Sequence, residues 1–218
     1  ARTRAPALQR AATRSTCLRA PGGLAALLVA KEGEDASFAL LPADHVIEDA
    51  RGFQSTLETA FEAAEAEDQL VTVGIKPTFP ATGYGYLEQG SVLAEYAGRS
   101  VSEVSRFVEK PNLAKAQEYV DAGNYFWNAG MFVWRPSVIL AEIDLLVPRL
   151  SSGLKTLGNE WDRENDLEAA MDKVYPELEK ISIDFAVMEK AERVAMVESS
   201  FDWDDVGEWP AIERHYPK

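Results

Sequence analysis

Three aspartates lie within four positions near the end of the chain, in the stretch FDWDDVGEW (Phe201–Trp209). Aspartate and glycine favour turns, because an Asp side chain readily bonds its own backbone, so one interpretation is a solvated loop. Carboxylates are also the oxygen ligands that magnesium prefers in proteins. The stretch is therefore a candidate for part of a metal site, to which other parts of the chain must contribute.

Three other short loops carry polar residues directly after apolar runs. They contain Asp44 and His45 in LPADH, the segment TGYG at residues 82–85, and the pair Glu109 and Lys110 in EKP. Each is a weak signal alone, because Asp44 could cap a turn and Glu109 with Lys110 could form a surface ion pair of little energetic value. His45 has no second His or Cys at metal-ligand spacing, so it is interpreted as a turn or packing residue.

Apolar periodicity predicts the elements that position these loops. Short β-rich runs predict strands, and apolar residues three or four positions apart predict helices. Asn112 and Ser137 are residue types that cap helix N-termini. Strands are expected at residues 38–41, 70–75, 104–108 and 124–134, and helices at 23–31, 53–64, after Asn112, after Ser137 and within 151–179.

The alternation of strands and helices predicts an α/β fold, with a mainly parallel sheet and helices on both faces. In open sheets of this kind, ligands bind in a crevice outside the carboxyl ends of the strands. Each of the four polar loops follows a strand candidate. We therefore expect the four loops to meet at one site.

The composition limits the classes of partner. The chain has 218 residues, 46% of them hydrophobic, which is enough to bury a sizeable core. Its formal net charge of -14 opposes binding to nucleic acid polymers and anionic membranes, because the summed field repels phosphates. No apolar run approaches the length that crosses a bilayer. The single cysteine, Cys17, excludes an internal disulfide and suits a reducing compartment.

Six segments occur in one order along the chain, namely FALLPADHVI, GIKPTFPATGYGYLE, FVEKP, YFWNAGMFVWRP, SIDFAVMEKA and FDWDDVGEW. Together, from about Leu24 to Trp209, they resemble the bacterial mannose-1-phosphate guanylyltransferases, the GDP-mannose pyrophosphorylases. The resemblance implies a Rossmann-like nucleotidyltransferase fold and an enzyme that converts GTP and mannose 1-phosphate into GDP-mannose and pyrophosphate. It also favours a cytoplasmic protein, with a homodimer as a candidate assembly.

The implied reaction brings two anions together, so a cation must offset the charge that accumulates on the phosphoryl oxygens. Magnesium suits this task because it keeps several waters and needs only one or two protein carboxylates. In the family the metal-binding aspartate directly precedes Val-Gly, which selects Asp205, and Asp44 supplies the second carboxylate. Asp202 and Asp204 are then expected to be loop residues around the ligands, and Trp203 to pack against the loop.

The resemblance assigns the other loops to the mannose side of the pocket. Lys110 is expected to offset the negative charge of the sugar phosphate, and we count it with Asp44 and Asp205 as a catalytic candidate. Glu109 can accept hydrogen bonds from sugar hydroxyls, and Asn128 can both donate and accept. The loop formed by Thr82, Gly83, Tyr84 and Gly85 is expected to bring backbone groups close to the hexose.

The front of the chain departs from the family pattern. Family members open with a Gly-rich loop of the form GGxGxRLxPxSxxxxPK, whereas residues 10–30 here resemble a later family segment, with Ser15 where the family has Asn. We therefore expect residues 1–9 to be unrelated, and residues 10–218 to form a partial domain with impaired activity. The arginine-rich opening is also typical of organelle transit peptides, but residues 10–30 favour the cytoplasmic interpretation.

Two alternative functions remain open from the sequence. A noncatalytic relative that binds nucleotide sugars would keep the mannose loops without the triphosphate loop. A nucleotidyltransferase for another hexose 1-phosphate is the second alternative, although WNAGMF and DWDDVGEW resemble the mannose branch.

Overall fold

The computed structural model describes residues 21–32, 35–96 and 98–206. The expectations for residues 1–9 and for Cys17 concern positions outside these ranges, and Gly207 and Trp209 of the FDWDDVGEW segment also lie outside them. Internal contacts divide the chain into two compact units, the first formed by Ala1–Phe38 with Arg135–Glu192 and the second by Ala39–Trp134 with Arg193–Lys218. Every candidate site residue belongs to the second unit.

The first unit is helical. Its elements are α2 (Pro21–Lys31), α5 (Pro136–Leu146), α6 (Pro148–Glu164), α7 (Leu167–Val174) and the short helices η1 (Tyr175–Glu177) and η2 (Asp184–Met188). Leu24 and Leu28 of α2 are buried in a cluster with Leu157 and Ala170, which confirms the buried helix and the helical segment expected from periodicity. No helix within the described residues has the length and apolar character needed to cross a membrane.

The expected cap of α5 was wrong. The helix begins at Pro136, so Ser137 lies inside its first turn and Arg135 occupies the N-cap position without a capping bond from its side chain. Proline is favoured at the first helical position because its fixed φ suits the helix, so the helix begins at Pro136, before the predicted cap. The capping contact comes instead from Asp35, whose carboxylate accepts from the Ser137 N–H at 3.0 Å and from its hydroxyl at 2.6 Å.

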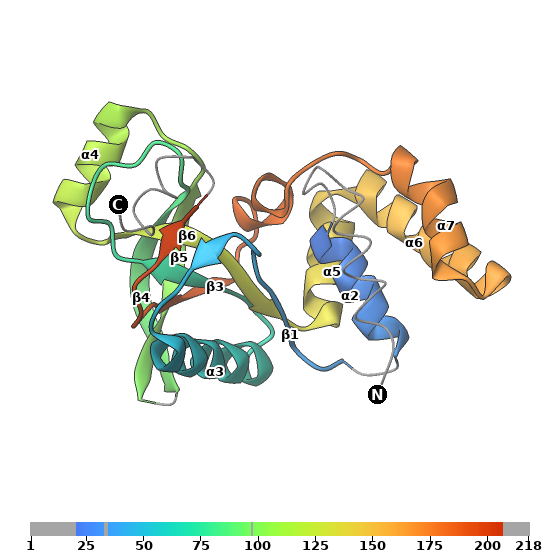
Figure 1. The fold of residues 1–218 in the computed structure, drawn as a ribbon, viewed down its shortest axis with the longest axis horizontal. Helices are drawn as coiled ribbons and strands as arrows, with labels where there is room; N and C mark the ends of the chain where they lie inside the picture. The colour runs from blue at the N-terminus through green and yellow to red at the C-terminus, as the bar shows by residue number, and fades with distance from the viewer. Residues whose placement is uncertain (1–20, 33–34, 97, 207–218) are drawn as a thin grey trace, which may run out of the picture. The chain divides into compact units, whose positions relative to one another are not determined.

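The second unit contains the sheet (Figure 1). Six strands are ordered β1-β6-β3-β7-β5-β4, and β4 also pairs with β6. A separate two-stranded ribbon joins β2 to β8. The strands are β1 (Phe38–Leu40), β2 (His45–Val46), β3 (Leu70–Ile75), β4 (Tyr86–Tyr96), β5 (Arg99–Val108), β6 (Tyr125–Trp134), β7 (Val194–Glu198) and β8 (Asp204–Asp205).

The sheet is mixed, but mostly antiparallel where the sequence predicted a mainly parallel one. Strands β3 and β7 are parallel, whereas β3–β6, β4–β5, β4–β6 and β5–β7 are antiparallel. The difference arises at β4, whose polar and Gly-containing sequence was not predicted as a strand. Because β4 and β5 form a long hairpin around Gly98, the chain reverses direction there and adds antiparallel neighbours to the sheet. The α/β class itself is confirmed.

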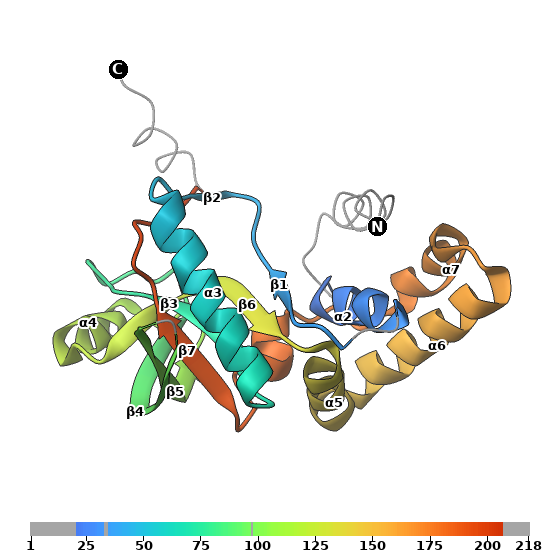
Figure 2. The same cartoon turned by 90° about the horizontal axis from the view of Figure 1, so that it is seen from below.

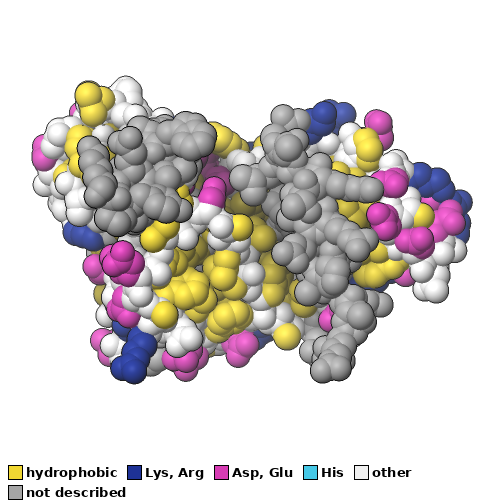
Figure 3. Space-filling view, in the orientation of Figure 1, with side chains coloured by type: hydrophobic (Ala, Val, Ile, Leu, Met, Phe, Trp, Pro, Cys, Tyr) yellow, Lys and Arg dark blue, Asp and Glu magenta, His cyan; other side chains and the backbone are white. Residues whose placement is uncertain are grey.

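Two helices pack against this sheet (Figure 2). Helix α3 (Ala50–Ala66) is capped by Asp49 and buries Ala60, Ala63 and Ala64 in a cluster with Val71 and residues of other strands. Helix α4 (Leu113–Ala122) begins after Asn112, whose side chain accepts from the Lys115 N–H, so the expected cap is confirmed. On the face seen in Figure 3, hydrophobic side chains gather over the sheet beside α3, and acidic side chains are scattered.

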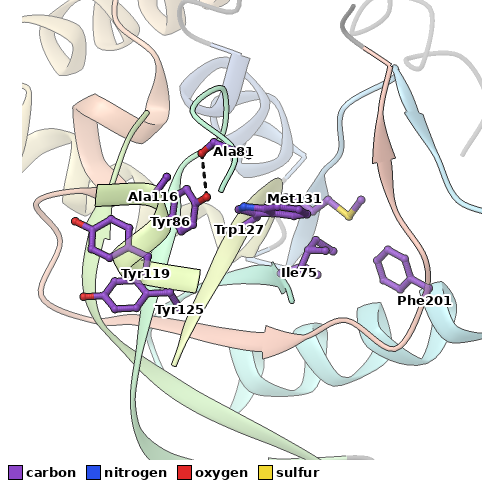
Figure 4. Close-up of a cluster of buried hydrophobic side chains, with 11 residues drawn as sticks. Ile75, Ala81, Tyr86, Ala116, Tyr119, Tyr125, Trp127, Met131 and Phe201 are labelled. Atoms are coloured by element: carbon purple, nitrogen blue, oxygen red, sulfur yellow. Dashed lines mark hydrogen bonds between the residues drawn. The ribbon is translucent and has the colours of Figure 1, made fainter. Parts of the chain in front are cut away.

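An aromatic core lies directly beneath the loop at residues 76–85 (Figure 4). Tyr86, Tyr119, Tyr125 and Trp127 are all buried there, and the rings of Tyr119 and Tyr125 stack at 4.2 Å between centroids. Such contacts between large rings are a rigid support, because aromatic side chains bury much area with few rotatable bonds. This core fixes the strands from which the candidate site residues project.

Candidate functional site

Asp44 and Asp205, which come from opposite ends of the described chain, meet in the β2–β8 ribbon. The two strands are antiparallel, with His45 opposite Asp205 and Val46 opposite Asp204. The Val206 N–H donates to the Asp44 carbonyl at 3.2 Å. Asp44 thus lies opposite Val206 and diagonally from Asp205, so the backbones of the two candidate metal ligands are neighbours across one ribbon.

The donor set at this ribbon suits a cation that keeps part of its water shell. Asp44 is exposed in the bend before β2, and Asp205 is half-buried on β8. Among the described residues, no group of three or more His, Cys, Asp or Glu side chains is arranged to hold a metal. Two carboxylates completed by water and substrate oxygens are the usual protein contribution to a magnesium site, so the residues fit that ion.

Asp202, three residues before Asp205, holds the loop. Asp202 Oδ1 accepts from the Asp49 N–H at 3.2 Å, while the Asp49 carboxylate caps α3 by accepting from the N–H groups of Arg51 and Gly52. This contact ties the segment before Asp205 to the start of α3. The role of a loop-fixing residue that the sequence suggested for Asp202 has a structural basis here.

Trp203 and His45 join the two strands of the ribbon through their side chains. The Trp203 Nε1–H donates to His45 Nδ1 at 3.0 Å, with the rings edge to face at 5.1 Å. An accepting Nδ1 is unprotonated, so the neutral ring carries its proton on Nε2. Burial lowers the pKa of His45, and the charges of Asp205 and Asp44 oppose this by a smaller amount. A neutral histidine is the form that accepts from Trp203.

The loop at residues 82–85 is held from both sides. The Tyr86 hydroxyl donates to the Ala81 carbonyl at 2.9 Å, which fixes the loop at its base (Figure 4). The Tyr84 ring packs edge to face against Trp127 and Trp203, each at 5.2 Å between centroids. Thr82 and Gly83 are exposed at the loop's tip. Tyr84 thus connects this loop to the ribbon that carries Asp44 and Asp205.

Gly85, Glu109 and Asn128 lie together, and we call them the Gly85 cluster. The Asn128 N–H donates to the Gly85 carbonyl at 2.8 Å. A Cβ added at Gly85 would lie 2.5 Å from Glu109 Oε2 and 3.4 Å from Asn128 Cβ, so the Glu109 carboxylate would have to move aside. At Gly83 an added Cβ would meet nothing within 4 Å. The close approach to Glu109 therefore involves Gly85 and not Gly83.

Lys110 follows the cluster in an unusual conformation. Its φ of 48° lies in the left-handed region, which costs a non-glycine residue roughly 1 kcal/mol. Its Nζ is 3.5 Å from Glu109 Oε1, and the Lys110 side chain is 62% exposed while that of Glu109 is 11% exposed. Residues with strained backbone cluster at functional sites, where the surrounding structure holds them in place. The ammonium group remains accessible to an anion.

The side chain of Asn128 has a defined orientation. Its Oδ1 accepts from the Thr72 hydroxyl at 3.1 Å and from the Gly130 N–H at 3.2 Å. A backbone N–H can only donate, so the atom that faces it must be the amide oxygen, and the NH₂ group points elsewhere. Thr72 was not identified from the sequence, because it lies inside an otherwise apolar strand and carries no motif signal.

These groups combine two chemistries within one unit. The carboxylates at the ribbon can hold a divalent cation, and Lys110 can bind a phosphate as a point charge. Glu109 and Asn128 supply an acceptor and a mixed donor and acceptor, which suits the hydroxyl groups of a sugar. A site for a phosphorylated sugar beside a cation is consistent with all of them.

The profile of the family described as "Nucleotidyl transferase" matches residues 19–217. The chain belongs to the nucleotidyl transferase family. It is 40% identical over 193 residues to a mannose-1-phosphate guanylyltransferase of Sinorhizobium fredii, covering 88% of this chain and 37% of the relative. It is also 40% identical over 189 residues to the xanthan biosynthesis protein XanB of Xanthomonas campestris, covering 87% and 39%. The chain spans about two fifths of the length of these curated relatives.

A solved structure supports the fold. A Thermus thermophilus protein, named a mannose-1-phosphate geranyltransferase, aligns with a TM-score of 0.78 and 37% sequence identity. The alignment covers 94% of this chain and 57% of that one. The nucleotidyltransferase fold expected from the sequence is confirmed.

Proposed function

We propose that this chain forms the sugar-phosphate side of a mannose-1-phosphate guanylyltransferase, which transfers GMP from GTP to mannose 1-phosphate and releases pyrophosphate. The observation that carries the proposal is the Gly85 cluster, with Lys110 beside it. The names of the Sinorhizobium fredii and Thermus thermophilus relatives support mannose 1-phosphate as the sugar substrate.

The reaction requires little covalent chemistry from the protein. A phosphate oxygen of mannose 1-phosphate attacks the α-phosphorus of GTP, a new P–O bond forms, and the bond to the β-phosphate oxygen breaks as pyrophosphate leaves. Catalysis then depends on aligning two anions and offsetting their charge. Lys110 would hold the sugar phosphate, while Glu109 and Asn128 would orient the hexose through its hydroxyl groups.

Asp44 and Asp205 would hold the magnesium ion. When bound, the ion supplies positive charge that offsets the repulsion between the phosphate groups. The bond from Trp203 to His45 joins the two strands of the ribbon, and the contact between Asp202 and Asp49 ties the segment before Asp205 to α3, which would limit the movement of the proposed ligands.

Calorimetry on the chain with magnesium present tests the sugar assignment. Mannose 1-phosphate should bind more tightly than glucose 1-phosphate, because the two differ in the direction of the C2 hydroxyl that the cluster must read. Equal affinity for the two sugars would favour a nucleotidyltransferase for another hexose, and no binding of either would refute the proposal.

A second assay separates an enzyme from a binding protein. The chain is incubated with GTP, mannose 1-phosphate and magnesium, and pyrophosphate release is measured. Turnover that Asp205→Asn abolishes supports the transferase. Binding of mannose 1-phosphate and GDP-mannose without turnover would instead favour a noncatalytic relative.

A further inference from the structure

We infer that Thr72 is a positioning residue that orients the side-chain amide of Asn128 for the sugar. Thr72 lies on β3, between Val71 and Val73, and is fully buried. The role of Thr72 in sugar binding rests on the proposed function, whereas its contact with Asn128 does not. Nothing in the motifs of the sequence distinguishes this threonine.

A threonine at this buried position is less favourable than a valine unless its hydroxyl forms a hydrogen bond. All six residues of β3 are buried, and valine has nearly the same shape and a high preference for strands. A buried hydroxyl costs free energy unless it forms a hydrogen bond. The Thr72 hydroxyl lies 3.1 Å from Asn128 Oδ1 and 3.2 Å from the Met131 carbonyl, and its single proton can serve either acceptor. Both acceptors belong to β6, so the hydroxyl is directed at that strand.

The pairing of β3 with β6 is irregular where this contact forms. Thr72 pairs with Phe132 and Gly74 pairs with Asn128, with a register shift between the two pairs. Gly130 has a φ of 65°, which turns its N–H toward Asn128 Oδ1. The irregularity lets the side chains of Thr72 and Asn128 meet, although the two residues are not opposite each other in the ladder.

The Gly130 N–H fixes the direction of the amide, and the Thr72 hydroxyl lies against the same oxygen. A rotation of the amide by 180° would leave the Gly130 N–H facing an NH₂ group, and the Thr72 hydroxyl could then donate only to the Met131 carbonyl. The Asn128 Cβ lies close to Gly85, and so does Glu109 Oε2. The Asn128 amide therefore belongs to the same cluster as Glu109, and its orientation decides which hydroxyl groups it can recognise.

The matched variants are Thr72→Val, which removes only the hydroxyl, and Thr72→Ser, which keeps it. Thr59→Val is the control, because Thr59 is equally buried but its hydroxyl faces the Ser55 and Tyr96 carbonyls and not Asn128. Thr72→Ala provides a second variant without the hydroxyl if the valine disturbs packing. Thermal unfolding of each variant reports stability separately from binding.

The first measurement is the NMR signal of the Asn128 side-chain NH₂ group in the ligand-free chain, assigned by its loss in Asn128→Ala. We expect Thr72→Val to shift this signal, and Thr72→Ser and Thr59→Val to leave it in place. An unchanged signal in both Thr72→Val and Thr72→Ala would overturn the inference, whether or not the protein binds a sugar phosphate.

The second measurement is the affinity for mannose 1-phosphate. Loss of one neutral hydrogen bond predicts about a two- to tenfold weaker affinity in Thr72→Val, with Thr72→Ser close to the starting chain. In an Asn128→Ala background, Thr72→Val should have no further effect, because the two residues act as one unit. Full additivity would overturn the role for the sugar, whereas absence of binding by the unmodified chain refutes the proposed function instead.

Discussion

At the scale of single residues, the two glycines of TGYG differ in their surroundings and should differ in how well they tolerate substitution by alanine. Gly85→Ala would place a methyl group 2.5 Å from Glu109 Oε2, so Glu109 or the loop must move. Glu109 Oε2 is the end of a flexible side chain, so the cost to stability should be small. The displaced carboxylate would lose its hydrogen bond to the sugar, and we expect affinity for mannose 1-phosphate to fall about tenfold.

Gly83→Ala is the matched control for that substitution. An added Cβ there meets open space, so binding measured by calorimetry should be unchanged. Equal losses in the two variants would show that the loop acts through backbone flexibility and not through its close approach to Glu109.

Lys110 should show opposite effects on stability and on binding. Lys110→Gly relieves the left-handed φ of 48°, so the melting temperature should rise by the equivalent of roughly 1 kcal/mol. The same change removes a charge-assisted contact to phosphate, typically worth about 1.5–3 kcal/mol, so mannose 1-phosphate should bind more weakly.

Lys115→Ala removes an exposed charge from α4, where Lys115 pairs with Glu118, and serves as the charge control. It should leave the affinity unchanged. If Lys110→Gly binds mannose 1-phosphate as tightly as the unmodified chain, Lys110 has no part in the site.

At the scale of elements, the sequence predicted those segments whose pattern is local. The apolar run Leu70–Ile75 became β3 with the expected bounds, and Asn112 caps α4 as expected. Strand β4 was missed because its polar residues carry no clear alternation and because hairpin pairing with β5 holds it in place. Pairing with another strand is a tertiary effect, which the β-propensity of single residues does not predict.

Asp35 provides a pH-dependent test at the start of α5. Hydrogen bonds from the Ser137 hydroxyl and N–H hold its pKa below the usual value. A carboxyl group with a lower pKa in the folded state stabilises the fold above its unfolded pKa of about 3.9, and the contribution is lost as the pH falls through the folded pKa.

We therefore expect Asp35→Ala to lower the free energy of unfolding by about 0.5–2 kcal/mol at pH 7, as for other lost helix caps. The difference between Asp35→Ala and the unmodified chain should narrow below about pH 4, measured by urea unfolding. A difference that stays constant from pH 7 to pH 3 would mean that the carboxylate charge does not contribute.

At the scale of the whole molecule, the site could be predicted only in part. The loops with Asp44, residues 82–85, Glu109 and Asp205 were identified because each follows an apolar run and matches a family motif. Thr72 and the bond from Trp203 to His45 were not, since each depends on residues that only the folded chain brings together.

The central claim is that one unit of this chain combines a cation site at Asp44 and Asp205 with a sugar-phosphate site at the Gly85 cluster. Calorimetric titration with GDP-mannose, with magnesium or with EDTA, tests it most directly. Asp204→Asn is the matched control, because it removes the same charge from the neighbouring residue of β8, which is not one of the proposed ligands. We predict that magnesium tightens binding in the unmodified chain and in Asp204→Asn, and that this gain disappears in Asp205→Asn. Binding that is equally tight with EDTA, and unaffected by Asp205→Asn, would contradict the account.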